Sequence, residues 1–367
     1  MSMNKKEIAQ IRRRFAPEKN AISVVRGCYV NERKEIVSTF AKSPLSLPES
    51  EAEHYMSTFK KTLGGAQGRN LFSISVPDSQ LLRRLQMSEL KDEASVEEFC
   101  RSVIGALEFE GSYLILMMHD AWDLPRKKDV EHGERPDFDG EVFNYIMAAV
   151  CPVKPTKPLL TFFADDRQFH TAEPDLAVGG PALGFMYPAF EDGGANVSAA
   201  QFYTKDASDI HADFIDAVFG VEAPKSAADQ RQIFYDALSD TLDDSMNFDV
   251  VQTIHENLTA QLAERKKDAE PLEVSRREIS SLLSSCDVPQ SKIAAFEEEY
   301  LEQFGAVGLP AGTIAEAKRF EIATESATVN VAPDRSDLVE MKRIDGRRCI
   351  VIHVEGDVTV NGVEVNI

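Results

Sequence analysis

One short apolar segment constrains the fold of this chain more than any other part of its sequence. Tyr113–Met118 is an uninterrupted apolar run within Gly111–Asp123. It is too short for a buried helix, and an apolar run without polar alternation is typical of a strand that is covered on both faces. The run ends abruptly in a polar group that contains His119, Asp120 and Asp123. We therefore expect a central strand here, with any chemistry at its carboxyl end.

Length and composition indicate a globular protein of more than one domain. The chain has 367 residues, which is more than one ordinary core accommodates, so we expect two or three domains. Its content of 43% hydrophobic and 28% charged residues excludes the disordered class. The net charge of −21 opposes binding to nucleic acids and anionic membranes, and no apolar stretch approaches the ~20 residues of a membrane span. We predict no contact with DNA or with a membrane.

The cysteines favour a cytoplasmic protein. Their number is odd and no two are close in sequence, so neither a disulfide framework nor a zinc knuckle is indicated. The N-terminus is charged and lacks the apolar region of a signal peptide. We expect a cytoplasmic location and reduced thiols at all five positions, which are Cys28, Cys100, Cys151, Cys286 and Cys349.

The order of helical and strand-like segments predicts an α+β fold. Helices alternate with strands in the first part, and successive strands follow, which indicates a mixed sheet over residues 1–206. We expect a helical region over 207–268, and after a charged linker a small α+β unit over 272–367. That unit would contain two helices and antiparallel hairpins, because Asp345-Gly346 and Asn361-Gly362 are typical of type I′ turns. Val142–Val150 is predicted as a strand, although its apolar spacing also fits a helix.

Helix starts are predicted by a Ser or Asn followed three residues later by Glu, the signature of a capping box. This pattern occurs three times, at Asn4 with Glu7, at Ser95 with Glu98, and at Ser275 with Glu278.

Several motifs together resemble one family. The opening MNKKEIxxIRRRFxPEK, LILMMHDAWD at Leu114–Asp123, and LGFMYPAFED at Leu183–Asp192 are similar to an uncharacterised family from Gram-positive bacteria, classified as a domain of unknown function. The matches extend over nearly the whole chain. The resemblance implies one full-length architecture and a cytoplasmic setting, and it implies no activity.

One candidate site is the end of the central strand. An imidazole beside carboxylates can act as a general base or bind a divalent metal, so His119, Asp120 and Asp123 are the candidate residues of a metal-assisted hydrolase. Sites of this kind collect at the carboxyl ends of strands in sheets that contain parallel strands. Asp165, Asp166 and His170 would add ligands. In the simpler alternative these polar residues only end the strand, and no complete catalytic motif is present in the sequence.

The other candidate is the basic N-terminal segment. Residues 1–34 contain nine Lys or Arg and three Glu, in contrast to the acidic remainder. Such a segment can contact RNA phosphates or an acidic protein. The alternative is that the arginines pair with carboxylates of the chain itself, for example within Asp236–Asp249. The candidate partner-binding residues are Arg12, Arg13, Arg14, Lys19 and Arg26.

The leading interpretation is a cytoplasmic binding or regulatory protein with an unknown protein or RNA partner, without a cofactor or metal. It depends on the contrast in charge and on the lack of a complete catalytic motif. The hydrolase is the alternative. A homo-oligomer that forms through the edge of the C-terminal sheet is a third hypothesis.

Overall fold

The computed structural model confirms the α+β fold. It describes residues 3–16, 21–124, 141–165, 167–171, 174–265, 268, 270–315, 319–360 and 363–365. The chain divides into two compact units, Met1–Ser226 and Ala227–Ile367. The first contains a large antiparallel sheet, and the second contains helices and small hairpins.

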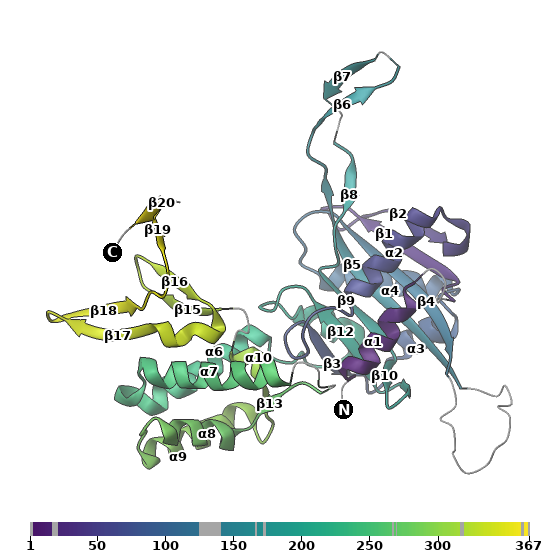
Figure 1. Cartoon of the computed structure of the whole chain (residues 1–367). Coiled ribbons are helices and arrows are strands. Elements are labelled where there is room, and N and C mark those ends of the chain that lie inside the picture. The colour runs from purple at the N-terminus through teal and green to yellow at the C-terminus, as the bar shows by residue number, and fades with distance from the viewer. Residues whose placement is uncertain are drawn as a thin grey trace, which may run out of the picture. The chain divides into compact units, whose positions relative to one another are not determined.

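The sheet of the first unit has the strand order β2-β1-β4-β5-β9-β12-β3, and β8 pairs with β5 beside this path (Figure 1). Every pair in it is antiparallel, where the sequence had indicated a mixed sheet. The strands are β1 (Val24–Val30), β2 (Ile36–Lys42), β3 (Leu71–Ser75), β4 (Tyr113–Asp123), β5 (Val142–Pro155), β8 (Leu176–Val178), β9 (Leu183–Tyr187) and β12 (Ala199–Thr204).

Helices cover both faces of this sheet, which explains the apolar run in β4. Ile115 and Met117 pack into a core with α3 (Gln80–Met87), α4 (Glu93–Ala106) and α5 (Ala212–Phe219). Leu116 and Met118 belong to a second core, which α1 (Lys5–Arg14) and α2 (Glu49–Lys61) close. Successive side chains of a strand point to opposite faces, and here both faces are covered by apolar layers. The sequence of such a strand is therefore apolar throughout and does not alternate between apolar and polar residues. The prediction of a strand that is buried on both faces is confirmed.

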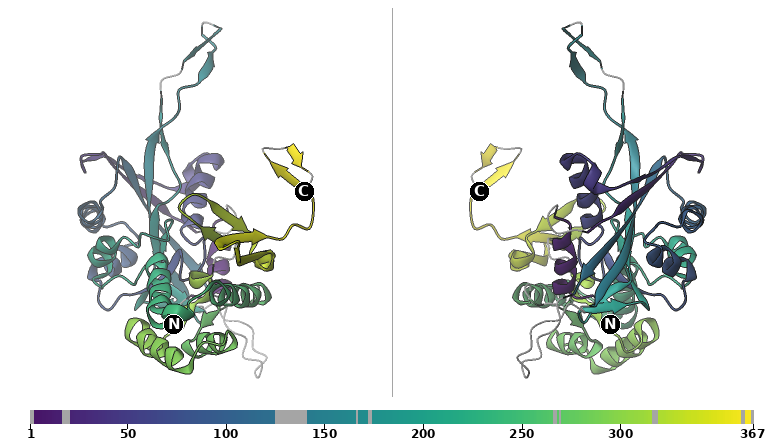
Figure 2. Two further views of the ribbon diagram at one scale, coloured as in Figure 1. Left: turned by 90° about the vertical axis from the view of Figure 1, so that its left-hand side faces the viewer. Right: turned by 90° about the vertical axis from the view of Figure 1, so that its right-hand side faces the viewer.

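A long ribbon leaves the sheet at the end of β5. The segment Val142–Val150 is a strand, not a helix, and β5 continues to Pro155. Beyond it the Thr156 amide donates to the Asp175 carbonyl at 2.7 Å, and the chain continues as a two-stranded hairpin (Figures 1 and 2). We call this hairpin the arm. It consists of β6 (Leu160–Phe163) and β7 (Gln168–Thr171). The unit also contains η1 (Pro44–Ser46) and a small hairpin of β10 (Ala189–Glu191) and β11 (Gly194–Asn196).

The second unit is built on a helical core, to which β13 and β14 contribute. Three hairpins follow in sequence, β15–β16, β17–β18 and β19–β20. The elements are α6 (Ala227–Leu242), η2 (Asp243–Ser245), α7 (Phe248–Glu264), β13 (Glu273–Val274), α8 (Arg276–Ser285), α9 (Gln290–Phe304), β14 (Leu309–Pro310), α10 (Ala311–Ile314), β15 (Phe320–Ala323), β16 (Thr328–Val331), η3 (Pro333–Leu338), β17 (Val339–Ile344), β18 (Arg347–Ile352), β19 (Val358–Val360) and β20 (Val363–Val365).

Packing groups the helices differently from the order along the chain. Helix α5, which the sequence placed in a separate helical region, packs on the sheet of the first unit. The core of the second unit takes Leu258 and Ile279 from the two sides of the expected linker. In both cases the apolar side chains determine where the helix packs, because a helix is stable where its apolar stripe is covered.

Two of the three capping boxes are confirmed, at the starts of α1 and α8. The third is wrong. The N-cap of helix α4 is Asp92, three residues earlier than expected, and the Ser95 hydroxyl donates to the Asp92 carboxylate at 2.5 Å.

The type I′ turn between β17 and β18 is confirmed by positive φ at Asp345 (50°) and Gly346 (77°). Asn361-Gly362 lies outside the described residues. Within the described part of the chain, no helix has the length and apolar character needed to cross a membrane.

Candidate functional site

The structure separates the polar residues at the end of β4. Neighbouring residues of a strand point to opposite faces of the sheet. His119 lies on the face covered by α3, α4 and α5, where its Nε2 is hydrogen-bonded to Asn144 Oδ1. Asp120 lies on the face covered by α1 and α2, and Asp123 is exposed. The three side chains therefore do not converge on one cavity.

Asp120 is the centre of a buried polar network. Its carboxylate is fully buried and accepts hydrogen bonds from Arg14 Nε (2.8 Å), Arg14 Nη2 (3.1 Å), the Ala21 amide (2.9 Å) and the Tyr145 hydroxyl (2.8 Å). Burial lowers the pKa of Arg14, but the hydrogen bond and charge of Asp120 outweigh it and raise that pKa above its ordinary value. Burial, and then the charge of Asp120, raise the pKa of Tyr145 well above 10. All acceptor positions of this carboxylate are in use, so its arrangement is that of a structural group that joins α1 to the sheet.

The direction of the strands explains why no other strand end brings further polar residues to this place. Carboxyl ends collect at one edge only when strands are parallel, and β4 instead runs antiparallel to both of its neighbours. His119 and Asp120 also lie inside the ladder, since β4 pairs with β5 as far as Asp123. His170 belongs to the arm, where it is exposed and contacts Phe163. Asp165 is likewise exposed near the tip of the arm, and Asp166 lies outside the described residues. No cluster of three or more potential metal ligands occurs among the described residues.

The cysteine beside Pro152 has the environment of a structural thiol. Cys151 is fully buried, and burial raises its pKa to about 12. A thiol that stays protonated at neutral pH is a poor nucleophile.

The five candidate partner-binding residues have different roles. Arg14 is bound to Asp120, and Arg26, whose side chain is 12% exposed, pairs with Glu93 at 3.0 Å. Both pairs lie within the first unit. Arg13 is exposed, and Arg12 is half-buried with a buried Nε that has no hydrogen-bond partner among the described residues. Lys19 lies outside the described residues. Of the leading arginines, Arg13 is therefore the most accessible.

The arm is the feature that sequence reasoning missed. The sequence indicates successive strands in this part of the chain, but it does not indicate that two of them are exposed. Phe162 lies opposite Phe169, and Leu160 lies opposite Thr171, so these side chains share one face of the ribbon. Leu160, Phe162 and Phe169 are 73%, 52% and 67% exposed. In the sequence Thr161 separates the apolar Leu160 and Phe162, and this short pattern does not show whether a partner covers the apolar face.

The arm has no core of its own. A two-stranded ribbon is marginally stable in water unless a third strand or a helix covers its apolar face. Within the arm, Phe162 and Phe169 contact each other at 5.4 Å between ring centroids, and Phe163 contacts His170 across the strands. These contacts bury little, because all eight residues of the two strands remain exposed. The apolar face of the arm is therefore exposed and not covered by a third strand or a helix among the described residues.

Comparison with known proteins gives a family and no activity. No curated protein and no solved structure matches this chain. A family described only as a domain of unknown function (DUF4317) matches residues 3–363. The match covers nearly the whole chain, and the protein therefore belongs to this family.

Proposed function

We propose that this protein is a binding protein and that the arm anchors it to another protein. The exposure of three large apolar side chains on one face of the arm is the observation that carries this proposal. Full burial of a completely exposed side chain of this size contributes roughly 1.5–3 kcal/mol to the free energy of association. These side chains are 52–73% exposed, so each would contribute somewhat more than half of that. A groove in a partner would supply the layer that the isolated ribbon lacks.

Chemistry favours a protein over a nucleic acid as the partner. The apolar face of the arm consists of Leu160, Phe162 and Phe169, and Thr171 is its only polar member. Aromatic rings can stack on bases, but binding of single strands also needs a positively charged groove. The net charge of −21 opposes it.

A partner with a different sequence is favoured over a second copy of this chain. A stable interface buries about 800 Å² on each side, which is far more than three side chains of a narrow ribbon provide. Two arms that meet face to face would therefore bind weakly. In this proposal the arm fills a groove, and other surfaces of the partner add the remaining area.

Site-directed photo-crosslinking in the organism that makes the protein would test the proposal. A photoreactive benzoylphenylalanine replaces Phe162 on the apolar face, and in the matched control it replaces Thr161, which points to the opposite face. We expect position 162, and not position 161, to give an adduct of one defined mass with a different protein.

Three results would contradict the proposal. They are the absence of any adduct, equal adducts from both positions, and an adduct with a second copy of the chain. The last would instead support the homo-oligomer.

A second contact surface follows from α1. No ion pair among the described residues involves Lys5, Lys6 or Arg13, and all three are exposed. Together they give α1 an accessible basic face, which in this proposal contacts an acidic surface of the same partner. Replacement of all three by Glu should weaken capture of the crosslinked partner without a loss of stability. RNA as the main captured species would overturn the assignment to a protein.

Two further parts of this proposal concern the cellular location of the protein and the hydrolase alternative. We place the protein in the cytoplasm of Gram-positive bacteria, which is supported by the family resemblance and by five cysteines that are all free in the structure. Cell fractionation would test the location. We do not carry the metal-assisted hydrolase forward, because His119, Asp120 and Asp123 lie in three separate environments.

A further inference from the structure

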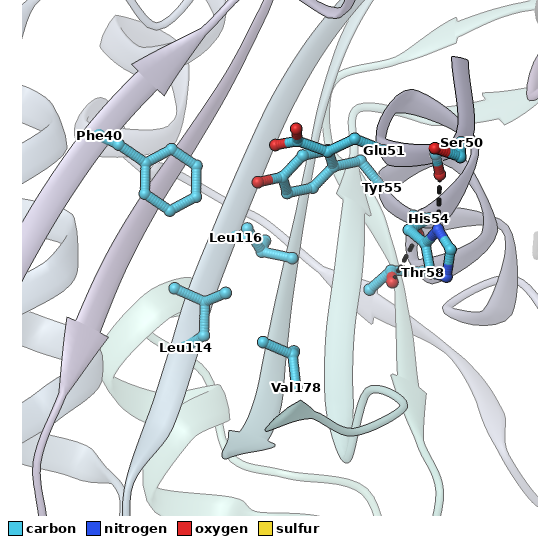
Figure 3. A pocket seen from close by; sticks show the side chains of 9 residues that line it. All are labelled: Phe40, Ser50, Glu51, His54, Tyr55, Thr58, Leu114, Leu116 and Val178. Carbon is cyan, nitrogen blue, oxygen red and sulfur yellow. Dashed lines mark hydrogen bonds between the residues drawn. The ribbon is translucent and has the colours of Figure 1, made fainter. Parts of the chain in front are cut away.

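A cavity of about 560 Å³ lies on the α1–α2 face of the sheet, apart from the arm's apolar face. Ligand sites in proteins usually have volumes of about 300–1,000 Å³ and mostly apolar walls. The lining comes from four elements, α2, β2, β4 and β8. Figure 3 shows Glu51 and Tyr55 extending from α2 toward Phe40, with Leu114 and Leu116 on the strand between them. Val178 completes the apolar part.

A glycine opposite Phe40 shapes this cavity. Gly27 of β1 pairs with Phe40 of β2, and a side-chain carbon at position 27 would collide with the Phe40 ring. Because glycine has no side chain, the ring can lie across β1. From there Phe40 contacts Tyr55 at 6.2 Å between ring centroids. The two rings form one aromatic wall of the cavity.

The charged groups at the cavity neutralise one another. Lys42 Nζ lies 2.7 Å from the Glu51 carboxylate and 5.5 Å from the centre of the Phe40 ring. His54 Nδ1 is hydrogen-bonded to the Ser50 carbonyl of its own helix. Burial raises the pKa of Tyr55, so its hydroxyl stays protonated and uncharged at neutral pH.

These features define the class of ligand. A charged ligand would lose hydration on entering this apolar cavity and would find no unmatched counter-charge there. A neutral apolar molecule loses little favourable hydration on entering the cavity, and it gains contacts with Leu114, Leu116 and Phe40. The Tyr55 hydroxyl interacts with Glu51 and Lys42, and its remaining lone pair can accept one hydrogen bond from a ligand. We propose that this cavity binds an uncharged, mainly apolar small molecule, with one polar group hydrogen-bonded to the Tyr55 hydroxyl.

Binding of N-phenyl-1-naphthylamine to the full chain tests the proposal. This probe is uncharged and aromatic, and its fluorescence rises in apolar sites. We expect saturable binding of one probe per chain. Thr58→Trp fills the cavity from α2 and should lower the affinity at least tenfold. The matched control Ser57→Trp places the same side chain on the exposed neighbouring position and should change the affinity less than twofold.

A second variant tests the predicted hydrogen bond. Tyr55→Phe keeps the aromatic wall and removes the hydroxyl, so it should weaken binding about fivefold, as expected for one hydrogen bond of about 1 kcal/mol. Circular dichroism must show that each variant is folded.

Three outcomes would overturn the proposal. They are no saturable binding to the wild type, equal binding to Thr58→Trp and Ser57→Trp, and tighter binding of the anionic 8-anilinonaphthalene-1-sulfonate than of the neutral probe. Arm variants do not change this cavity, so this test and the crosslinking test can fail separately.

Discussion

Replacement of Arg14 by Met should destabilise the first unit strongly. The substitution preserves most of the length of the side chain and removes its charge. Asp120 would then remain fully buried, with only the Ala21 amide and the Tyr145 hydroxyl as donors. Removal of one partner of a buried ion pair typically costs about 3–5 kcal/mol, because it leaves a charge without compensation. Since the Arg14 side chain is 13% exposed, we expect a value near the lower end, about 3 kcal/mol.

A surface pair provides the matched control. Arg84 and Glu98 are separated by only 2.6 Å, but both side chains are about half exposed. Water screens such pairs, so Arg84→Met should cost less than about 1 kcal/mol. The distances in the two pairs are similar, and the comparison therefore isolates the effect of burial.

Urea unfolding followed by tryptophan fluorescence would measure both variants. The sequence contains a single tryptophan, and Trp122 lies in the first unit with the Arg14 guanidinium 5.5 Å from its ring. The signal therefore reports on this unit. A double variant, Arg14→Met with Asp120→Asn, should recover part of the loss, because no buried charge remains. A cost below about 1 kcal/mol for Arg14→Met would refute the reasoning, since the pair would then behave as a surface pair.

Three further predictions follow from buried groups. The pKa of Tyr145 is raised in the folded state, so its contribution to stability is complete below pH 10 and falls above it by about 1.4 kcal/mol per pH unit. Tyr145→Phe should therefore reduce the slope of the unfolding free energy against pH by that amount in alkaline solution. Gly184→Ala should lower the melting temperature, because its added carbon would collide with the backbone carbonyl of Ala148, which cannot move aside as a side chain can. In native protein Cys151 should resist a thiol reagent that modifies the half-exposed Cys286, and equal rates would contradict the buried environment.

The candidate site shows where sequence reasoning failed. The expectation for His119 and Asp120 required a parallel sheet, since only there do carboxyl ends of strands gather. An apolar run such as Tyr113–Met118 indicates burial on both faces, but it contains no information about the direction of the neighbouring strands. The same run therefore predicts the central strand correctly. The position of a site at its end depended on the additional assumption that the neighbouring strands are parallel. Pairing between β4 and β5 places both residues inside the ladder.

The N-terminal arginines show that the sequence also does not determine which charged residues form ion pairs. Their cluster is visible in the sequence, and the acidic residues of the chain make internal pairing an alternative to partner binding. The sequence does not show which residues pair, because Arg14 and Asp120 are 106 residues apart and meet only when α1 packs on the sheet. Arg13, the neighbour of Arg14, points outward on the same helix. Helix geometry gives adjacent residues different environments, so one cluster contains both a structural and an accessible arginine.

The sequence alone determined the features that depend on near neighbours. The strand character of β4, the capping boxes of α1 and α8, and the turn at Asp345-Gly346 follow from local periodicity and backbone preference. Tertiary structure decided which faces are covered. It buried Asp120, exposed the apolar face of the arm, and formed the cavity between Phe40 and Tyr55. Burial of a side chain depends on segments that are distant in sequence, and for this reason only packing could distinguish a structural residue from an available one.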